Sequence, residues 1–265
     1  MTILPHLNPQ DPSFPGDASP QPPFGIVDSL RSIGVWTIGA PHLAFWAALV
    51  TAVSKVSDTK KIDRAIKFMS RAVPKLAGVD VTVKGLERFD HSKTYVYVVN
   101  HVNIFDMFAI YQAIPQYTRS LEHVSHFSWP LIGPFITAAG QIPVDPQDKK
   151  LTARGLKRAL AMLKNGESLV VLPEGERTLD GTVGTFYPGA FRLAIQANVP
   201  VVPMAIHGGR TVSRRGDWRV RPGRMTVSFG NPVPTEGMTI RDSAALAQTC
   251  KECIISLLQT ENRTL

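Results

Sequence analysis

Cysteine is scarce in this sequence, whose 265 residues include only Cys250 and Cys253. Two cysteines this close together provide no disulfide framework, so nothing argues for secretion and a cytoplasmic redox environment is the default. The pair also lacks a second Cys-x-x-Cys and any thioredoxin-like context, which argues against a zinc site or redox chemistry. The N-terminus lacks the basic segment and early apolar run of a signal peptide.

Loops that cradle nucleotides are also missing, because neither Gly-x4-Gly-Lys-Ser/Thr nor Gly-x-Gly-x-x-Gly occurs. Nucleotide hydrolysis and dinucleotide redox chemistry are therefore excluded. His123, His126 and His207 are scattered without a carboxylate cluster, so we expect no metal site, and we expect no other cofactor. Acidic residues are fewer than basic ones, 21 against 29, and the net charge of +8 implies an anionic partner. No aromatic platform or recognition motif accompanies this charge, so nucleic acid is not the predicted partner.

The overall composition is that of a globular protein, with 44% apolar and 19% charged residues. No repeat of the length that builds solenoids or propellers occurs, and the length fits one domain with an N-terminal extension. Residues 1–31 contain seven prolines and little periodicity. This segment is predicted to be an extended or disordered lead-in.

A run of 23 residues without formal charge follows, from Ser32 to Ser54. At ~1.5 Å per helical residue, the run would just cross a hydrocarbon core ~30 Å thick. Pro41 and His42 lie at its middle, and proline interrupts helical hydrogen bonds, so we expect a kinked, re-entrant or interfacial segment. A buried core helix is the alternative, which the length and uniformity of the run disfavour.

Residues 58–73 are predicted to form an amphipathic helix with one apolar stripe at helical spacing. Its opposite face is basic and consists of Lys60, Lys61, Arg64, Lys67 and Arg71. Such a face suits an anionic lipid surface, and a solvated face of a helix packed on the protein's own core is the alternative. We therefore expect residues 32–76 to be a membrane-associated helical segment. The excess of Lys and Arg after the apolar run would leave the C-terminal body on the cytoplasmic face.

Residues 77–265 alternate between near-continuous apolar strands and helices. We predict strands at 81–83, 95–99, 142–144, 169–172, 201–206 and 225–229, and helices at 104–113, 129–138, 151–163, 190–197 and 242–258. This pattern predicts an α/β domain whose largely parallel sheet is flanked by helices on both faces. In such folds, active sites usually lie at the carboxyl ends of the strands.

Two polar turns follow buried strands of this domain. His101 and Asp106 lie in the first, between a strand and a helix, where side chains five residues apart can meet. A carboxylate bound to one imidazole nitrogen fixes the tautomer and leaves the other nitrogen as a general base. The second turn is Pro173-Glu174-Gly175-Glu176-Arg177, whose arginine can bind a phosphate through paired donors. A structural histidine and a surface ion pair between Glu174 and Arg177 are the alternative interpretations.

Three segments together resemble a known family. In order and separation, His101-x4-Asp106, Pro173-Glu174-Gly175-x-Arg177 and Val199-Pro200-Val201-Val202-Pro203 resemble three of the four sequence blocks of the 1-acyl-glycerol-3-phosphate acyltransferase family. The resemblance covers roughly residues 80–235 and implies that the predicted domain at residues 77–265 is a glycerolipid acyltransferase domain. Such a domain would transfer a fatty acyl group from acyl-CoA or acyl carrier protein, as co-substrate, to a hydroxyl at a membrane phospholipid surface. The implied acceptor is lysophosphatidic acid, and the product is phosphatidic acid.

Carried over by position, the resemblance gives roles to six residues. His101 would deprotonate the acceptor hydroxyl, and Asp106 would hold His101. Glu174, Gly175 and Arg177 would form the acceptor pocket, with Arg177 on the phosphate, and Pro203 would shape the following strand end.

One block departs from the family pattern at Pro146, which occupies the place of an arginine that often helps to bind the acceptor phosphate. Arg177 must then carry more of the phosphate binding, or Lys149 and Lys150 must reach back. The same chemistry on another lysophospholipid, or on the hydroxyl of an acylated amino acid, therefore stays open. A non-catalytic membrane lipid-binding protein is a further alternative, which the presence of both His101 and Asp106 disfavours.

Two further features are a departure that leaves the core of one block intact and a basic segment outside the blocks. Glu176 and Thr178 stand where the family commonly has threonine and serine. The basic run from Arg210 to Arg224 is either a solvated surface or a site for an anionic head group or the phosphates of coenzyme A.

Overall fold

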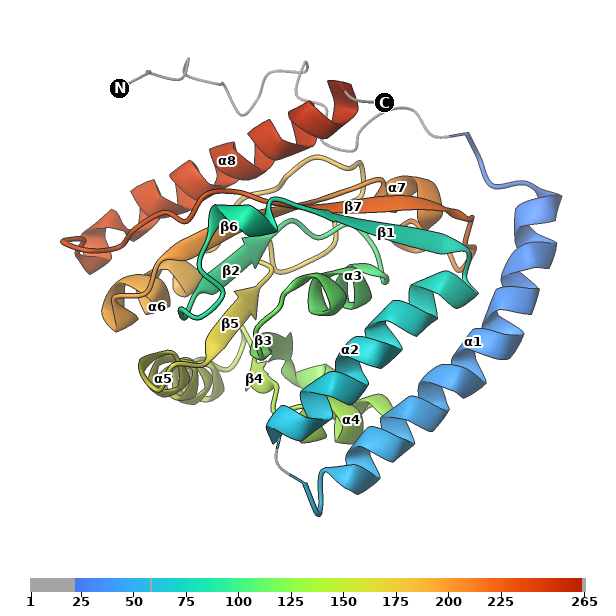
Figure 1. The fold of residues 1–265 in the computed structure, drawn as a ribbon, viewed down its shortest axis with the longest axis horizontal. Coiled ribbons are helices and arrows are strands. Elements are labelled where there is room, and N and C mark those ends of the chain that lie inside the picture. Colours follow the sequence, from blue (N-terminus) through green and yellow to red (C-terminus); the bar gives the residue numbers. More distant parts are fainter. Residues whose placement is uncertain (1–21, 58, 264–265) are drawn as a thin grey trace.

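The computed structural model describes residues 22–57 and 59–263. They form a seven-stranded sheet with helices on both faces, and two long helices, α1 (Ile26–Val53) and α2 (Thr59–Leu76), lie along one side (Figure 1). The α/β class and the largely parallel sheet predicted from the sequence are confirmed.

The strand order is β1-β7-β6-β2-β5-β3-β4, and every neighbouring pair is parallel except β6 and β7. The carboxyl ends of β6, β2, β5, β3 and β4 therefore meet at one edge of the sheet. The strands are β1 (Val79–Lys84), β2 (Val96–Val99), β3 (Thr118–His123), β4 (Ile142–Val144), β5 (Ser168–Val171), β6 (Val201–His207) and β7 (Gly223–Phe229).

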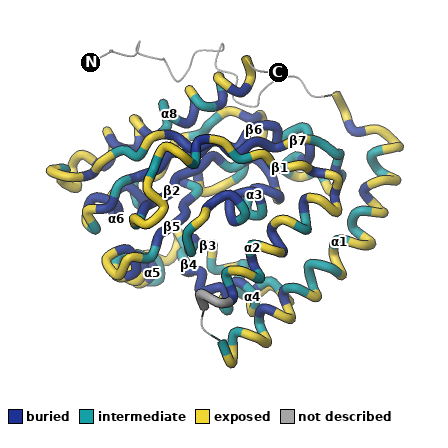
Figure 2. The backbone as a smooth tube through the Cα atoms, viewed as in Figure 1, coloured by how far each residue is buried: buried dark blue, intermediate teal, exposed yellow. Residues whose placement is uncertain are grey.

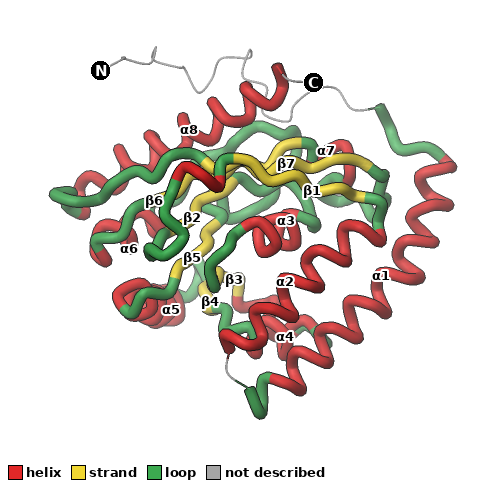
Figure 3. Tube along the Cα trace, viewed as in Figure 1, coloured by secondary structure: helices red, strands yellow, loops and turns green. Residues whose placement is uncertain are grey.

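Helices cover both faces of the central strands, as Figure 3 shows, so every residue of β2, β5 and β6 is buried. Alternate side chains of β2 enter different layers: Val96 and Val98 pack with α5, α6 and α8, whereas Tyr97 and Val99 pack with α3. These helices and the remaining two are α3 (Asp106–Ala113), α4 (Ile132–Ala138), α5 (Lys149–Lys164), α6 (Gly189–Ala197), α7 (Gly209–Val212) and α8 (Ser243–Arg263).

Helix α1 corrects two expectations. It begins at Ile26, so the predicted boundary of the lead-in at residue 31 is wrong, and residues 1–21 lie outside the described residues. The helix also continues through Pro41, so the re-entrant form, one of the three that we expected, is wrong. Pro41 lies on the exposed side and removes a single backbone donor, and the hydrogen bonds on either side of it keep the chain helical.

Much of α1 is exposed although it is apolar (Figure 2). By length and composition α1 can cross a membrane, and only 11% of its most apolar window is buried. A buried core helix would instead have most of its apolar side chains covered. The exposed large side chains on α1 are Ile26, Val27, Leu30, Ile33, Ile38, Phe45, Leu49 and Val53.

Helix α2 confirms the predicted apolar stripe, because Ile62, Ile66 and Met69 are buried. Its predicted basic face is only partly free for a lipid surface. Lys67 forms an ion pair with Asp63 at 2.8 Å and donates to the carbonyl of Pro115 at 2.7 Å. Arg64 and Arg71 are exposed, and the side chains of Lys60 and Lys61 lie outside the described part of the chain.

Candidate active site

His101 and Asp106 meet directly after β2. The Nδ1 atom of His101 lies 2.7 Å from Oδ2 of Asp106, which is the first residue of α3 and is fully buried. The same oxygen accepts the backbone N–H groups of Val102 and Asn103, at 2.5 and 2.9 Å. Because Nδ1 donates its hydrogen to the carboxylate, Nε2 is the nitrogen left to accept a proton. The geometry predicted for this turn is therefore present.

Glu174 holds the backbone of His101. One carboxylate oxygen accepts the N–H of His101 at 2.9 Å, and the other accepts the N–H of Gly184 at 2.7 Å. The N–H of Thr178 donates to the carbonyl of His101 at 2.8 Å, so the second polar turn forms hydrogen bonds with both the N–H and the carbonyl of His101. Burial raises the pKa of the Glu174 carboxyl, while the two N–H groups oppose that shift. Glu174 thus positions His101 as well as lining the neighbouring pocket.

Gly175 is required by its surroundings as well as by its turn. Its φ of +74° lies in the left-handed region, and a Cβ there would come within 3.1 Å of the Tyr187 ring. Both features disfavour any larger residue. The bare backbone at Gly175 therefore leaves Tyr187 room at the mouth of the pocket.

A pocket of about 370 Å³ opens beside this turn. Arg177 lines it, and no ion pair to its guanidinium is formed by the described residues. The pocket also receives Arg215, from the segment that follows α7. Its lining residues are Glu174, Glu176, Arg177, Thr178, Leu179, Asp180, Thr182, Gly184, Thr185, Tyr187 and Arg215.

The remaining predicted residues lie elsewhere. Pro203 is inside β6, paired with Val98 of β2, so it lies within the strand and not at the strand end. Its carbonyl accepts the N–H of Gly230, just beyond the end of β7. Pro146, Lys149 and Lys150 are exposed near the end of the edge strand β4, and none of them lines the pocket.

Two asparagines complete the site and were not singled out from the sequence. Asn100 exchanges hydrogen bonds with the backbone of Ile206 at 2.8 and 3.0 Å, which joins the ends of β2 and β6. Asn103 donates to the carbonyl of Gly209 at 2.6 Å and thereby places α7 against the His101 turn. Their only sequence signal is that both lie beside His101 in a polar stretch after a buried strand.

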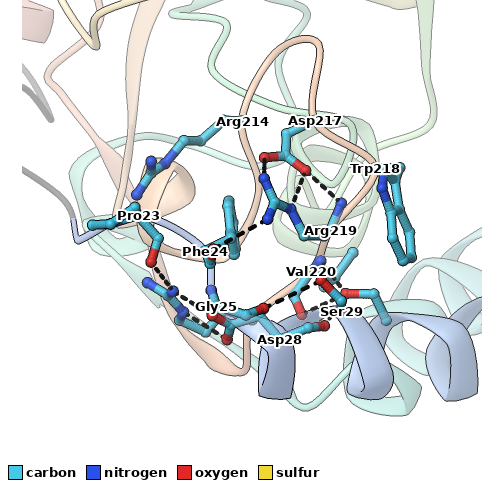
Figure 4. Close-up of polar contacts among 12 residues, drawn as sticks. Pro23, Phe24, Gly25, Asp28, Ser29, Arg214, Asp217, Trp218, Arg219 and Val220 are labelled. Atoms are coloured by element: carbon cyan, nitrogen blue, oxygen red, sulfur yellow. Dashed lines mark hydrogen bonds and ion pairs between the residues drawn. The ribbon is translucent and has the colours of Figure 1, made fainter.

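The basic run divides into two groups. Arg210 donates to the backbone carbonyls of Leu179 and Asp180, so it supports the pocket turn. Arg219 forms an ion pair with Asp217 of the same loop at 2.7 Å and donates to the carbonyl of Phe24 at 3.1 Å (Figure 4). Arg221 forms an ion pair with Asp28 of α1 at 2.6 Å.

Phe24 lies at the centre of the second group. The guanidinium groups of Arg214, Arg219 and Arg221 lie 4.6 to 5.1 Å from the centre of its ring. Hydrogen bonds from the Arg221 guanidinium hold the pKa of Asp28 well below its usual range. This group fastens the start of α1 to the sheet domain.

The three histidines considered for a metal site do not converge. His126 lies 3.1 Å from Glu122, His123 lies 3.8 Å from Asp145, and His207 lies 2.6 Å from Asn262. No group of three metal-ligating side chains occurs among residues 22–57 and 59–263.

Comparisons with known proteins find similarity to acyltransferases. The family profile described as Acyltransferase matches residues 80–207, which contain both polar turns. A 1-acyl-sn-glycerol-3-phosphate acyltransferase of Limnanthes alba is 30% identical over 62% of this chain and 58% of its own length. The human 1-acyl-sn-glycerol-3-phosphate acyltransferase alpha is 28% identical over 74% of this chain and 70% of its own.

A solved structure shows the same fold. The 1-acyl-sn-glycerophosphate (LPA) acyltransferase PlsC from Thermotoga maritima superposes with a TM-score of 0.76 and 22% identity, covering 89% of this chain and 97% of that one. Residues 80–207 therefore match an Acyltransferase profile, and the chain is similar to 1-acyl-sn-glycerol-3-phosphate acyltransferases. It spans less than two thirds of the length of its Limnanthes relatives.

Proposed function

We propose that this chain transfers a fatty acyl group from an acyl thioester to the free hydroxyl of 1-acyl-glycerol-3-phosphate, giving phosphatidic acid. Acyl-CoA or acyl carrier protein would supply the thioester. The observation that carries the proposal is the His101–Asp106 pair at the carboxyl end of β2, next to a pocket that contains arginine. Similarity to 1-acyl-sn-glycerol-3-phosphate acyltransferases supports the same reaction.

His101 acts as the general base in this proposal. Nε2 takes the hydroxyl proton as the oxygen attacks the thioester carbonyl carbon, so no acyl-enzyme forms. The new C–O ester bond replaces the C–S bond, and the departing thiolate takes the proton back from the imidazolium. Asp106 holds the tautomer and stabilises the imidazolium, while Glu174 and the N–H of Thr178 keep His101 in place.

The acceptor pocket would bind the phosphate through Arg177. Its guanidinium offers paired donors that match phosphate oxygens. Glu174 and Gly175 contribute to the shape of this pocket, Glu174 by its hydrogen bonds and Gly175 by the room that it leaves for Tyr187.

The membrane surface is the proposed place of the reaction. The exposed apolar side chains of α1 would enter the bilayer, with the sheet domain on the cytoplasmic face. The acceptor and the product both carry long acyl chains, so an enzyme at the surface meets them without extracting them into water.

A second candidate acceptor is a lysophospholipid with a larger head group. Pro146 stands where the family often has a phosphate-binding arginine, and neither Lys149 nor Lys150 lines the pocket in its place. The test for both candidates is the purified protein with labelled acyl thioester and a panel of lysolipids and acylated amino acids, with products identified by mass. The proposal is supported if phosphatidic acid is the main product. It is refuted if the protein forms no product with any of the acceptors.

A further inference from the structure

Arg215 is a second guanidinium in the pocket beside His101, and it belongs to the basic run and to none of the family's sequence blocks. It lines the pocket together with Arg177 and Tyr187. Its Nη1 atom donates to the backbone carbonyl of Arg177 at 2.7 Å. This bond fixes the Arg215 guanidinium against the turn that carries Arg177, and both arginines line the same pocket.

The other arm of Arg215 forms an ion pair that a ligand can replace. Its Nη2 atom lies 2.7 Å from Oε2 of Glu176, whose side chain is 71% exposed. An ion pair to such an exposed carboxylate contributes little to stability. Phosphate binds arginine more strongly than this, because two charge-assisted hydrogen bonds can form. An incoming phosphate can therefore displace Glu176.

We propose that Arg215 is a second phosphate-binding residue of the acceptor pocket, and that it exchanges Glu176 for the phosphate of the acceptor. This inference rests on the proposed function. It explains how a chain with Pro146 in place of an arginine still offers two guanidinium groups to one phosphate. Two other arginines of the basic run contact the start of α1 instead: Arg219 donates to the carbonyl of Phe24 at 3.1 Å (Figure 4), and Arg221 forms an ion pair with Asp28 at 2.6 Å.

The test compares three variants of the full chain, using lysophosphatidic acid and uncharged monoacylglycerol as acceptors. Arg215→Gln keeps an N–H donor for the Arg177 carbonyl but removes the charge. We expect it to raise KM for lysophosphatidic acid about ten- to a hundred-fold, the effect of losing one charge-assisted contact, with kcat and the monoacylglycerol reaction unchanged. Glu176→Gln frees Arg215 and should lower KM for lysophosphatidic acid. Arg192→Gln, at an exposed position of α6, is the matched control and should change neither reaction.

Opposite changes in KM for Arg215→Gln and Glu176→Gln distinguish a phosphate-binding role of Arg215 from a purely structural one. If Arg215 only supports the turn, Arg215→Gln and Glu176→Gln impair both acceptors alike, and the inference is overturned. Binding of 1-hexanoyl-glycerol 3-phosphate by calorimetry, without an acyl donor, gives a second readout that needs no turnover. If the wild type acylates no lysolipid, the proposed function fails, and the inference is then decided by whether Arg215→Gln weakens this binding about tenfold or leaves it unchanged.

Discussion

Replacing Asp106 with asparagine removes the negative charge beside His101 while keeping the shape of the side chain. Oδ2 of Asp106 accepts three hydrogen bonds, and Oδ1 is buried without a hydrogen-bond partner among the described residues. The asparagine oxygen can take the place of Oδ2, which puts the amide N–H groups at the buried Oδ1 position, where the wild-type side chain forms no hydrogen bond among the described residues. We expect this to cost about 1–3 kcal/mol of folding free energy, the usual penalty for an unsatisfied buried polar group.

The catalytic loss should be larger than the structural one. An imidazolium and a carboxylate with charge centres about 4 Å apart attract each other by about 4 kcal/mol at an effective dielectric constant near 20. This attraction develops only as His101 takes the proton, so it stabilises the transition state and not the bound substrate. Its loss corresponds to about a 10³-fold lower kcat, with KM little changed.

The assay is thiol release from the acyl thioester by the purified full chain, alongside thermal unfolding of each variant. Asp242→Asn is the matched control, because Asp242 accepts the N–H of Thr239 in a capping turn whose residues do not line the pocket. It should lose stability without losing activity. A folded Asp106→Asn variant with normal kcat would show that Asp106 only caps α3, and the proposed role of the pair would be wrong.

Three further outcomes are expected. Burial raises the pKa of Glu174, so the native state holds its proton more tightly and the free energy of unfolding should fall as pH rises from the ordinary value of 4.5 through the raised pKa. When the unfolding free energy is measured with denaturant over this pH range, Glu174→Gln should lack this pH-dependent fall. If the free energy depends on pH in the same way in wild type and variant, the raised pKa does not belong to Glu174. Gly175→Ala should reduce activity more than Gly237→Ala, because both have φ of +74° but only Gly175 has a neighbour, Tyr187, within 4 Å. Equal activities of the two variants would show that the space beside Tyr187 does not require glycine at position 175. Leu30→Glu with Phe45→Glu, at exposed positions of α1, should abolish sedimentation with anionic vesicles without lowering the unfolding temperature, and unchanged sedimentation would place the lipid contact elsewhere.

The central sheet and the His101 turn were predictable because buried parallel strands leave a strong sequence signal. β2, β5 and β6 are continuous apolar runs, and the polar residues that follow β2 and β5 stand out against them. Since neighbouring parallel strands end at the same edge, two such turns had to lie close together. The sequence alone therefore predicted that His101 and Glu174 share a site, although not that they are joined by a hydrogen bond.

Strand β3 was not predicted from the sequence. Its residues Thr118–His123 include Arg119, Glu122 and His123, and neither apolar alternation nor a continuous apolar run marks them. It forms a strand because β5 and β4 supply partners on both sides, which is information from outside the segment. The same limit applies to Arg215, since the basic run shows its charge but not which arginines face the pocket.

The role of His101 as general base is tested most directly by measuring acyl transfer by His101→Ala. We expect kcat to fall about 10²–10⁴-fold with an unchanged unfolding transition, because Nε2 of His101 is the proposed proton acceptor. His91→Ala is the matched control, since His91 is an exposed histidine that contacts only the carbonyl of Leu86 and the ring of Phe89 among the described residues, and it should leave transfer intact. Normal turnover by folded His101→Ala protein would contradict the mechanism.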